Sequence, residues 1–374
     1  MKIGYEAKRV FQNFSGLGNY SRNLINLLAK YYPENTYVLF APIITNLYTI
    51  QNCVEVVSPT SGFSKQIRPF WRLYKESKIL KSNGIDIFHG LSNVLPFGIK
   101  KSGIPTVLTI HDLIFLQFPT FYKKIDQILY RYITIHSCRN ATKIIAISHQ
   151  TKNDLINLLG IDPDKIEVIH QSCNNFFYDR VDEVQKAAIR QKFNLPKSFI
   201  LSVGTIEQRK NQLAILKGVV QEKLEIPIVL LGKPTDYMKQ LDEFIIKSDI
   251  QKQLIFLHKT NLAELQAIYQ MAEIMVYPSL YEGFGLPVLE AQASGCPVIT
   301  SNISSLPEAG GEGAIYIDPE NSQEIGRAIR NILTNEKLKS ELIQKGTANA
   351  LLFNDQTVAD KLMRLYQMLY DSHR

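Results

Sequence analysis

The chain has 374 residues, of which 45% are hydrophobic and 21% are charged, and its formal net charge is +7. This composition is typical of a soluble globular protein, and the length predicts two domains. No stretch approaches the ~20 apolar residues of a membrane-spanning helix, and the first residues do not resemble a signal peptide. The four cysteines are scattered without CxxC or metal-ligand spacing, which indicates a reduced, cytoplasmic protein.

The charge is distributed unevenly along the chain. Residues 1–180 carry 21 Lys and Arg against 12 Asp and Glu, whereas residues 181–374 carry 21 against 23. The basic half could attract nucleic acid, an anionic membrane surface or a phosphorylated substrate, or it could be an ordinary solvated surface. The sequence contains no recognised nucleic-acid-binding motif, so nucleic acid is not a predicted partner.

Short apolar runs rich in β-branched residues alternate with amphipathic stretches through the first half. In the last of these stretches, Ser148 is a candidate N-cap and Gly160 a candidate stop. The expected strands are 2–7, 36–41, 53–58, 85–90, 106–112, 143–148 and 165–170, and the expected helices are 19–32, 131–142 and 148–160.

The second half repeats this rhythm. The expected strands are 199–205, 227–232, 254–259, 274–279, 297–302 and 314–319, with helices at 211–224, 261–272, 286–295 and 322–335. Alternating strands and helices predict the α/β class, with two Rossmann-like, doubly wound parallel-sheet domains facing each other across a cleft. We expect the domains to be 1–175 and 176–355, followed by a C-terminal helix, 356–374, that could pack back on the first domain.

Ligands bind open parallel sheets beyond the carboxyl ends of the strands, so polar and glycine-rich segments directly after strands are candidate site residues. The segment YEGFGLPVLEAQASGC, residues 281–296, is the strongest of these. Its glycines permit close approach of a ligand, and Pro287 suits the first turn of a helix whose free amides could bind phosphate. Glu282 before this helix and Glu290 inside it suit sugar hydroxyl partners. A helix with an acidic first turn is the structural alternative.

Two basic residues follow another strand in SVGTIEQRKN, residues 202–211. Arg209 can bind phosphate oxygens through its planar fork, and Lys210 adds a compact charge. Together they could neutralise a diphosphate group without a metal, although two adjacent bases can also be a solvated surface pair.

The segment FQNFSGLGNYSRN, residues 11–23, carries Gly16 and Gly18 before an expected helix. GLGNYS weakly matches the GxGxxG fingerprint, so a dinucleotide oxidoreductase is an alternative. Ser21 replaces the third glycine, the loop does not directly follow the strand, and the expected acid about 20 residues on is absent. These departures count against a dinucleotide site.

Histidines end two expected strands. His111 and Asp112 follow TVLTI, and His89 with Gly90 ends IDIFHG. A histidine after such a strand can be structural or can hydrogen-bond a ligand hydroxyl. Their places at the ends of strands make His111 and His89 candidate site residues.

Two further segments follow strands in the second half. Ser304 and Ser305 are candidate site residues, whereas Glu308 could simply brace a helix. Residues 258–262 could frame a nucleobase. We find no DxD, HExxH or Walker A motif, and we predict no metal site and no cofactor.

The string EGFGLPVLEA resembles the Glu-x7-Glu signature of retaining glycosyltransferases of family 4, which have the GT-B architecture, and the resemblance extends over most of the chain. It implies that Glu282 contacts the donor sugar and that Glu290 binds the nucleotide ribose. It also implies that His111 lies beside the transferred sugar, where we expect it to shape the reacting site without acting as a general base, and we expect His89 to lie on the acceptor side. The family commonly has Gly-Arg where this sequence has Gly204-Thr205, so we rely on Lys210 more than on Arg209. The implied catalytic residues are His111, Arg209, Lys210 and Glu282, and the implied donor-binding residues are Gly16, Gly18, Gly283, Phe284, Gly285, Leu286, Glu290, Ser304 and Ser305.

The segments HDLIFLQFP, GTIEQRKN and TSNISSLPE look most like mannosyltransferases of this family that act in surface polysaccharide synthesis. The resemblance implies transfer of a hexose from a nucleotide sugar, with GDP-mannose favoured and UDP-sugars open, to a glycan or lipid-linked acceptor. Alternatives are a sugar-nucleotide epimerase of the same architecture and a non-catalytic nucleotide-sugar binder.

Aromatic and basic residues are interleaved in FSKQIRPFWRLYKESKILK, residues 63–81. Phe70, Trp71 and Tyr74 beside Lys and Arg favour a peripheral contact with the inner membrane face or an acceptor-binding face. The alternative is an ordinary helix with Trp71 turned inward.

Overall fold

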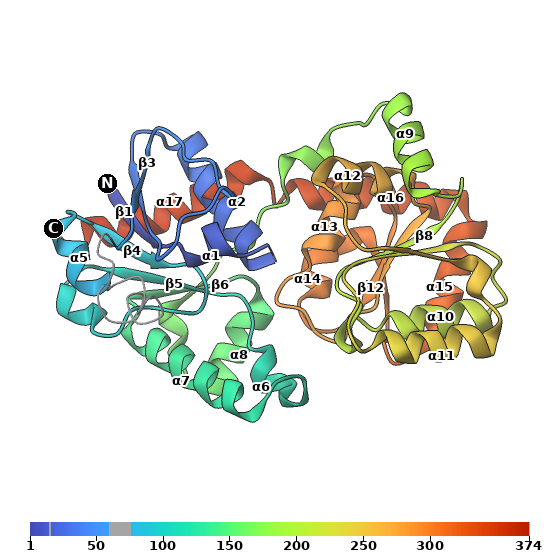
Figure 1. Cartoon of the computed structure of the whole chain (residues 1–374), viewed down its shortest axis with the longest axis horizontal. Helices are drawn as coiled ribbons and strands as arrows, with labels where there is room; N and C mark the ends of the chain where they lie inside the picture. The colour runs from blue at the N-terminus through green and yellow to red at the C-terminus, as the bar shows by residue number, and fades with distance from the viewer. Residues whose placement is uncertain (15, 60–75, 374) are drawn as a thin grey trace. The chain divides into compact units, whose positions relative to one another are not determined.

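The computed structural model describes residues 1–14, 16–59 and 76–373 (Figure 1). The chain divides into two compact units, the first formed by Met1–Gln171 together with Asp355–Arg374 and the second by Ser172–Asn354. The sequence analysis set its boundaries at 175 and 355. Most of the segment 63–81 lies outside the described residues, so the structure does not test the contact expected there.

The first unit contains a seven-stranded parallel sheet in the order β3-β2-β1-β4-β5-β6-β7. The chain builds outward from β1 in one direction and from β4 in the other, which is the doubly wound arrangement. The strands are β1 (Lys2–Glu6), β2 (Thr36–Phe40), β3 (Val54–Val57), β4 (Ile87–Gly90), β5 (Thr106–Ile110), β6 (Lys143–Ala146) and β7 (Ile166–Val168).

Both faces of this sheet are covered because successive strand residues point to opposite sides. Tyr37 and Leu39 of β2 join one core, whereas Val38 and Phe40 join the core on the other face. The first core includes residues of α2 and α17, and the second includes residues of α5, α7 and α8. The helices of this unit are α1 (Lys8–Gln12), α2 (Gly16–Tyr31), α5 (Glu76–Ser82), α6 (Ile114–Gln117), α7 (Lys124–Asn140), α8 (His149–Leu159) and α17 (Asp355–Asp371), with 3-10 turns at Ile99–Ser102, Pro119–Phe121 and Pro163–Lys165.

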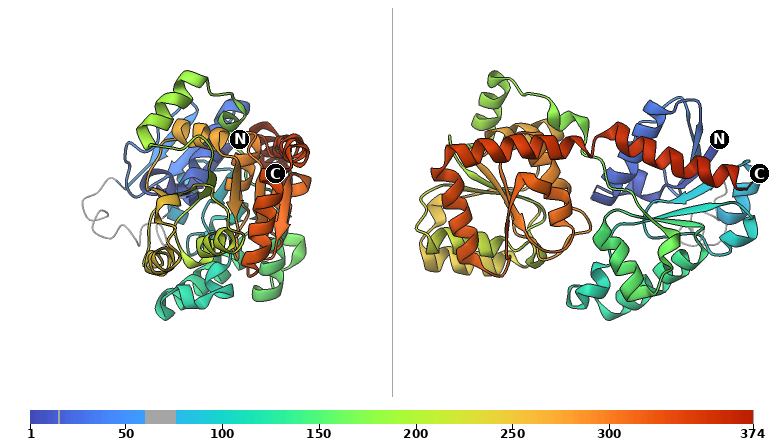
Figure 2. Two further views of the ribbon diagram at one scale, coloured as in Figure 1. Left: turned by 90° about the vertical axis from the view of Figure 1, so that its right-hand side faces the viewer. Right: turned by 180° about the vertical axis from the view of Figure 1, so that it is seen from behind.

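The C-terminal helix α17 is part of the first unit, although it follows the second unit in sequence. Figure 2 shows it in red against the blue elements of the first unit. Its buried apolar side chains lie in the same core as those of β1, β2 and α2. The sequence analysis left open where this helix packs, and its heptad-like apolar spacing fits a helix with one buried face.

The second unit contains a six-stranded parallel sheet in the order β10-β9-β8-β11-β12-β13. The strands are β8 (Ile200–Val203), β9 (Ile228–Leu231), β10 (Leu254–Leu257), β11 (Ile274–Tyr277), β12 (Val298–Ser301) and β13 (Ala314–Ile317). The helices are α9 (Glu183–Phe193), α10 (Gln212–Gln221), α11 (Met238–Ser248), α12 (Leu262–Met271), α13 (Leu286–Ala293), α14 (Leu306–Gly310), α15 (Ser322–Thr334) and α16 (Glu336–Leu351), with 3-10 turns at Asn175–Tyr178, Gln208–Lys210, Gln251–Gln253 and Gly311–Gly313.

The expected strands are confirmed in both units. The expected caps of α8 are also confirmed, because the Ser148 side chain accepts from the Thr151 amide and Gly160 adopts a left-handed conformation. Among the helices that were not predicted are α1, α6, α9, α11 and α16. No helix among the described residues is both long enough and apolar enough to cross a membrane.

Candidate active site

Two loops of the second unit meet because their strands are neighbours. β8 pairs in parallel with β11, so the carboxyl ends of both strands lie at one edge of the sheet. The chain leaves β8 through Gly204 toward a 3-10 turn at Gln208–Lys210, and it leaves β11 through the loop 278–285 toward α13. The amide of Leu280 donates to the carbonyl of Arg209 at 2.8 Å, which ties the two loops together.

Arg209, Lys210 and Glu282 form a compact ionic cluster at this edge. Arg209 Nη1 lies 2.8 Å and Lys210 Nζ lies 2.6 Å from Oε1 of Glu282. The three side chains are 16%, 11% and 12% exposed, so the cluster is screened little by water. The two basic residues and the first glutamate of the Glu-x7-Glu string are therefore brought together.

Tyr277, the last residue of β11, completes this cluster. Its hydroxyl donates to Glu282 Oε1 at 3.1 Å and accepts from Lys210 Nζ, which also lies 4.6 Å from the centre of the Tyr277 ring. The sequence analysis did not identify this residue. A tyrosine inside a buried strand needs a partner for its hydroxyl, and that requirement was the signal available in the sequence.

The charges of the cluster are strongly coupled. Burial alone would raise the pKa of Glu282, but Lys210 and Arg209 outweigh it and lower that pKa to about 2. Burial lowers the pKa of Lys210 against the attraction of Glu282. Burial also acts to lower the pKa of Arg209, but Glu282 and Glu207 raise it overall. Glu282 is therefore ionised at neutral pH.

The two basic side chains differ in how many donors remain. Arg209 donates to the Tyr281 carbonyl at 2.8 Å and to Glu207 at 2.6 Å, besides its pairing with Glu282. Lys210 has two recorded partners, Glu282 and Tyr277, for the three donors of an ammonium group. Three partners leave Arg209 two of the five donors of a guanidinium, and two partners leave Lys210 one of its three, so both side chains can donate to a further oxygen.

The loop that carries Glu282 is fixed by serines after β12. Ser304 Oγ accepts from the Glu282 amide at 3.1 Å and donates to the Glu282 carbonyl at 2.8 Å. Ser305 Oγ lies 2.9 Å from the carbonyl of Glu282 and 2.7 Å from that of Phe284. The sequence analysis assigned both serines to the donor phosphates, and in this structure their hydroxyls hold the loop.

The segment before α13 combines a backbone conformation that favours glycine with a packed aromatic ring. Gly285 caps the helix with φ of 127°, a conformation that favours glycine, and a Cβ there would lie 3.0 Å from the Leu306 side chain. Phe284 is buried and packs on Phe353, with ring centres 5.5 Å apart. Gly283 is also buried, and Leu286 begins α13, whose amides face the start of the helix.

Glu290 lies one turn inside α13, half-buried. Its Oε2 accepts from the hydroxyl of Tyr269 at 3.0 Å. Burial raises the pKa of Glu290 to about 7, although the hydrogen bond from Tyr269 acts in the opposite direction. The two glutamates of the string therefore have opposite electrostatic environments, one paired with cations and one with a neutral hydroxyl.

In the first unit, His111 directly follows β5 and is 4% exposed. Its Nε2 lies 2.9 Å from the Leu91 carbonyl and its Nδ1 lies 3.2 Å from Gln171 Nε2, so the ring is an Nε2–H tautomer with both nitrogens engaged. Burial lowers its pKa to about 4. In this arrangement a sugar hydroxyl could reach a ring nitrogen only by displacing Gln171 or the Leu91 carbonyl.

Gly16 and Gly18 lie at the start of α2 and differ in their surroundings. A Cβ at Gly18 would lie 2.0 Å from the carbonyl oxygen of Asn13, whereas a Cβ at Gly16 would meet nothing within 4 Å. Gly18 therefore permits the close approach of the preceding loop. Gly16 is exposed.

His89 belongs to a buried network in the first unit. Its Nδ1 lies 2.6 Å from the hydroxyl of Tyr366, and its Nε2 lies 2.7 Å from Oγ1 of Thr109. Thr109 in turn lies 3.2 Å from the hydroxyl of Tyr20, whose ring packs edge-on against His111. The acceptor-side role expected for His89 stays a prediction, because the structure shows it only as a link to α17.

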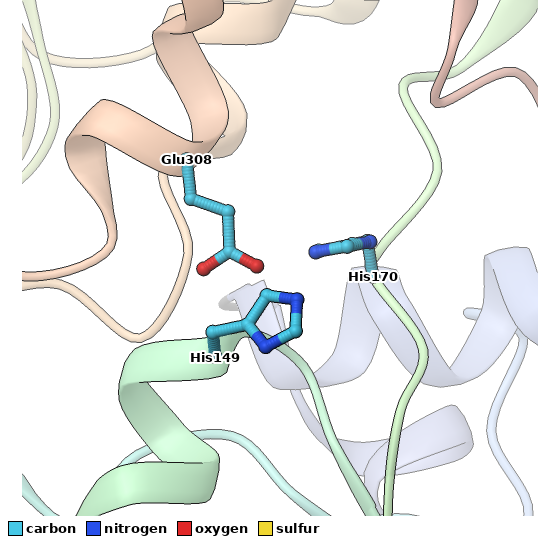
Figure 3. A group of neighbouring side chains, drawn as sticks. All are labelled: His149, His170 and Glu308. Atoms are coloured by element: carbon cyan, nitrogen blue, oxygen red, sulfur yellow. The ribbon is translucent and has the colours of Figure 1, made fainter.

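Two other groups bear on the sequence expectations. The segment 258–262 after β10 is largely exposed and ends in a capping box formed by Asn261 and Glu264. In the first unit, His149 and His170 place their ring centres 6.1 Å apart, and Figure 3 also draws Glu308, a residue of α14 in the second unit. Two histidines are fewer than the three or four protein ligands usual for zinc.

Comparison with known proteins assigns each unit to a described domain. Residues 14–174 match the model of Glycosyltransferase Family 4, and residues 185–349 match the model of Glycosyl transferases group 1. The O-antigen chain mannosyltransferase B of Escherichia coli is 25% identical over 99% of this chain and 100% of its own length. The O-antigen chain mannosyltransferase RfbU of Salmonella typhimurium is 27% identical over 76% of each chain.

Solved structures share the fold at lower identity. Sucrose-phosphate synthase from Thermosynechococcus elongatus superposes with a TM-score of 0.79 at 18% identity, covering 100% of both chains. HepE from Anabaena in complex with UDP and glucose gives a TM-score of 0.76 at 17% identity, covering 98% of this chain and 100% of that one. The two family models together match most of the sequence, and a relative of the same kind matches nearly the whole chain. The chain therefore belongs to the family 4 and group 1 glycosyltransferases and is a hexosyltransferase of the GT-B fold.

Proposed function

We propose that the enzyme transfers mannose from GDP-mannose to a hydroxyl group of a glycan or lipid-linked glycan, with retention of the anomeric configuration. The observation that carries the proposal is the cluster of Arg209, Lys210 and Glu282 at the carboxyl edge of β8 and β11, next to the start of α13. It puts two cations, an ionised carboxylate and a helix N-terminus in one place.

In this proposal the diphosphate is bound by positive groups that are already in position. Lys210 directs its remaining donor to a phosphate oxygen, and the first amides of α13 direct theirs to the same anion. As the bond between the sugar and the phosphate lengthens, these donors stabilise the charge that develops on the leaving diphosphate. The leaving phosphate then takes the proton of the acceptor hydroxyl, and no separate base is needed.

Glu282 has two tasks in this proposal. Its Oε1 holds Lys210, Arg209 and Tyr277 in place, which fixes the geometry before the donor binds. Its Oε2 accepts from a hydroxyl of the donor sugar. Glu290 accepts from the ribose hydroxyls, and its raised pKa means that these hydroxyls compete with a proton near neutral pH.

The donor and acceptor are inferred from relatives. Two of the relatives are O-antigen chain mannosyltransferases. A third, the serotype-specific mannosyltransferase WbdA of Escherichia coli, is 30% identical over 72% of this chain and 34% of its own length. HepE is named with UDP and glucose, so a UDP-sugar is the second candidate donor. The transfer is proposed to need no metal, because the cluster itself supplies the positive charge.

A screen of the full chain with GDP, UDP, ADP and their sugar conjugates tests the donor. A ligand that binds the folded state raises the unfolding temperature, and we expect GDP and GDP-mannose to give the largest shift. Incubation with GDP-mannose and a lipid-linked O-antigen acceptor should then release GDP and lengthen the glycan. A larger shift with UDP would reject GDP-mannose as the donor. An epimer formed from the donor alone would identify an epimerase. Binding of the donor without turnover on any glycan would identify a binding protein.

The variant Glu282→Gln separates the role of the carboxylate from that of the cations. It removes the anion that neutralises Lys210, so affinity for GDP should stay the same or increase, while turnover should fall by about 100-fold. Weakened GDP binding with undiminished turnover would contradict both assigned tasks of Glu282.

A further inference from the structure

Tyr277 places a hydroxyl between the opposite charges of the cluster. The hydroxyl donates to Oε1 of Glu282 at 3.1 Å and accepts from Nζ of Lys210. Because Nζ of Lys210 also lies 2.6 Å from the same carboxylate oxygen, the three groups close a small ring of hydrogen bonds. The ammonium group is thus directed by two acceptors, and the direction of its third donor follows from the other two.

The position of this hydroxyl is fixed by the fold. Tyr277 is 2% exposed and is the last residue of β11, an interior strand of the second sheet. Its carbonyl accepts from Oγ1 of Thr300 on the neighbouring strand β12 at 2.9 Å. A tyrosine side chain has only two rotatable bonds to its ring, so a buried ring on an interior strand holds its hydroxyl in one place.

The Lys210 side chain is confined along its stem as well as at its ammonium group. Nζ lies 4.6 Å from the centre of the Tyr277 ring, within the ~6 Å of a cation–π contact. The stem passes close to the backbone of Gly204, where a Cβ would lie 3.3 Å from Cε of Lys210. Tyr277 therefore contacts the ammonium group through both its hydroxyl and its ring.

We propose that Tyr277 is a positioning residue for the transfer reaction, which aims the third donor of Lys210 at the leaving diphosphate. In Tyr277→Phe the ammonium group keeps Glu282 and loses its second acceptor, so it can turn about that one contact and its donor is no longer preorganised. Tyr277 acts through Lys210 and touches neither substrate. The inference deepens the proposed function and rests on the role given there to Lys210.

The hydroxyl can donate and accept at once because it keeps its proton. Burial and the charge of Glu282 raise the pKa of Tyr277 well above its ordinary value, although Arg209 acts in the opposite direction. A neutral hydroxyl satisfies the carboxylate and the ammonium group together without adding a charge to a buried site.

Tyr277→Phe removes the hydroxyl and keeps the ring. We expect kcat for transfer from GDP-mannose to a lipid-linked O-antigen acceptor to fall by roughly tenfold, as for one hydrogen bond to a charged group. KM for GDP-mannose should change by less than about twofold, because the aimed donor acts mainly on charge that develops in the transition state. The matched control is Tyr316→Phe, whose hydroxyl donates to the carbonyl of Pro307 at 3.2 Å instead of to the cluster. A retained cooperative unfolding transition shows that each variant is folded.

The double variant Lys210→Ala/Tyr277→Phe separates positioning from packing. If Tyr277 acts through Lys210, the double variant has the same kcat as Lys210→Ala alone. A further loss of roughly tenfold in the double variant would overturn the proposal, as would wild-type kcat in Tyr277→Phe.

An NMR spectrum of the lysine ammonium groups tests the contact without donor or acceptor. A buried, hydrogen-bonded ammonium group exchanges its protons slowly with water, so we expect a Lys210 signal that is missing in Lys210→Ala. This signal should stay in Tyr316→Phe and be lost in Tyr277→Phe. Absence of the signal from the wild type, or its persistence in Tyr277→Phe, would overturn the proposal. If the wild type fails to use GDP-mannose, the proposed function is wrong, and the spectrum still decides whether Tyr277 holds Lys210.

Discussion

Lys210 is the side chain of the second unit for which the structure predicts the most specific role. It is buried between Glu282 and Tyr277, with one donor left for a further oxygen. Substitution of Lys210 by Ala should lower turnover by about 100- to 1,000-fold, as expected for the loss of one preorganised donor to a developing anion. Steady-state kinetics with the donor and acceptor measure this, with the exposed Lys239→Ala as the matched control. Wild-type turnover in Lys210→Ala would reject the role given to this residue.

The raised pKa of Glu290 predicts that the stability of the folded protein depends on pH. Its pKa of about 7 in the folded protein lies above the ordinary value of 4.5, so the folded state binds a proton more tightly than the unfolded state does. The stability that this proton contributes is present below about pH 4.5 and is lost as the pH rises through 7. Glu290→Gln, which cannot ionise, should therefore gain unfolding temperature relative to the wild type between pH 5 and pH 8.

Thermal unfolding of both proteins across this range gives the measurement. Glu264→Gln serves as a contrasting control, because the pKa of Glu264 is lowered, chiefly by its hydrogen bond with Lys192, and the sign of its effect is opposite. A constant difference in unfolding temperature between Glu290→Gln and the wild type at every pH would contradict the assignment.

At the scale of elements, the loop between α1 and α2 depends on one glycine and not on its neighbour. Gly18→Ala would place a Cβ 2.0 Å from the carbonyl oxygen of Asn13, which also accepts from Arg22 at 2.9 Å. Such overpacking lowers the free energy of unfolding by about 1–3 kcal/mol, so the unfolding temperature should fall by several degrees. Gly16→Ala meets nothing within 4 Å and is the matched control. Equal stability of the two variants would show that the loop can move aside.

The strands of this fold were predictable from the sequence, whereas several helices were not. In both cases the reason is that a sequence reveals an element only through its pattern of apolar residues. Strands buried on both faces of a parallel sheet are continuous apolar runs, and every run that was predicted as a strand became one. The helix α9 has no buried residue and α16 has three, so neither carries an apolar stripe that the sequence could reveal. α7 began seven residues earlier than expected, at Lys124 and not at Arg131, because its first turns expose their apolar side chains.

At the scale of the whole chain, the sequence identified the residues of the cluster but not their pairing. Glu282 and Lys210 are separated by 72 positions, and they meet because β11 lies beside β8. The sequence analysis assigned the glutamate to the sugar and the bases to the diphosphate, as separate contacts. They form a single ionic group because of the order of the strands in the sheet, and no local sequence pattern reveals that order.

The C-terminal helix α17 belongs to the first unit. Its removal should therefore change the stability of the first unit and not that of the second. α17 buries Val358, Leu362, Leu365, Tyr366 and Leu369 in the core of the first unit. At about 1.5–3 kcal/mol for each buried apolar side chain, their loss is comparable to the ~5–15 kcal/mol that stabilises a whole domain. It also leaves Nδ1 of the buried His89 without Tyr366.

A chain ending at Asn354 should therefore lose the calorimetric unfolding transition of the first unit and keep that of the second. The groups to which the proposed function assigns the phosphates and the ribose, namely Lys210, the first amides of α13 and Glu290, lie in the second unit, so GDP should still raise the remaining transition. Met368→Ser, which changes an exposed residue of the same helix, should leave both transitions in place. If the truncated chain instead unfolded as the full chain does, α17 would contribute little to the first core. If GDP no longer shifted the remaining transition, its site would require the first unit.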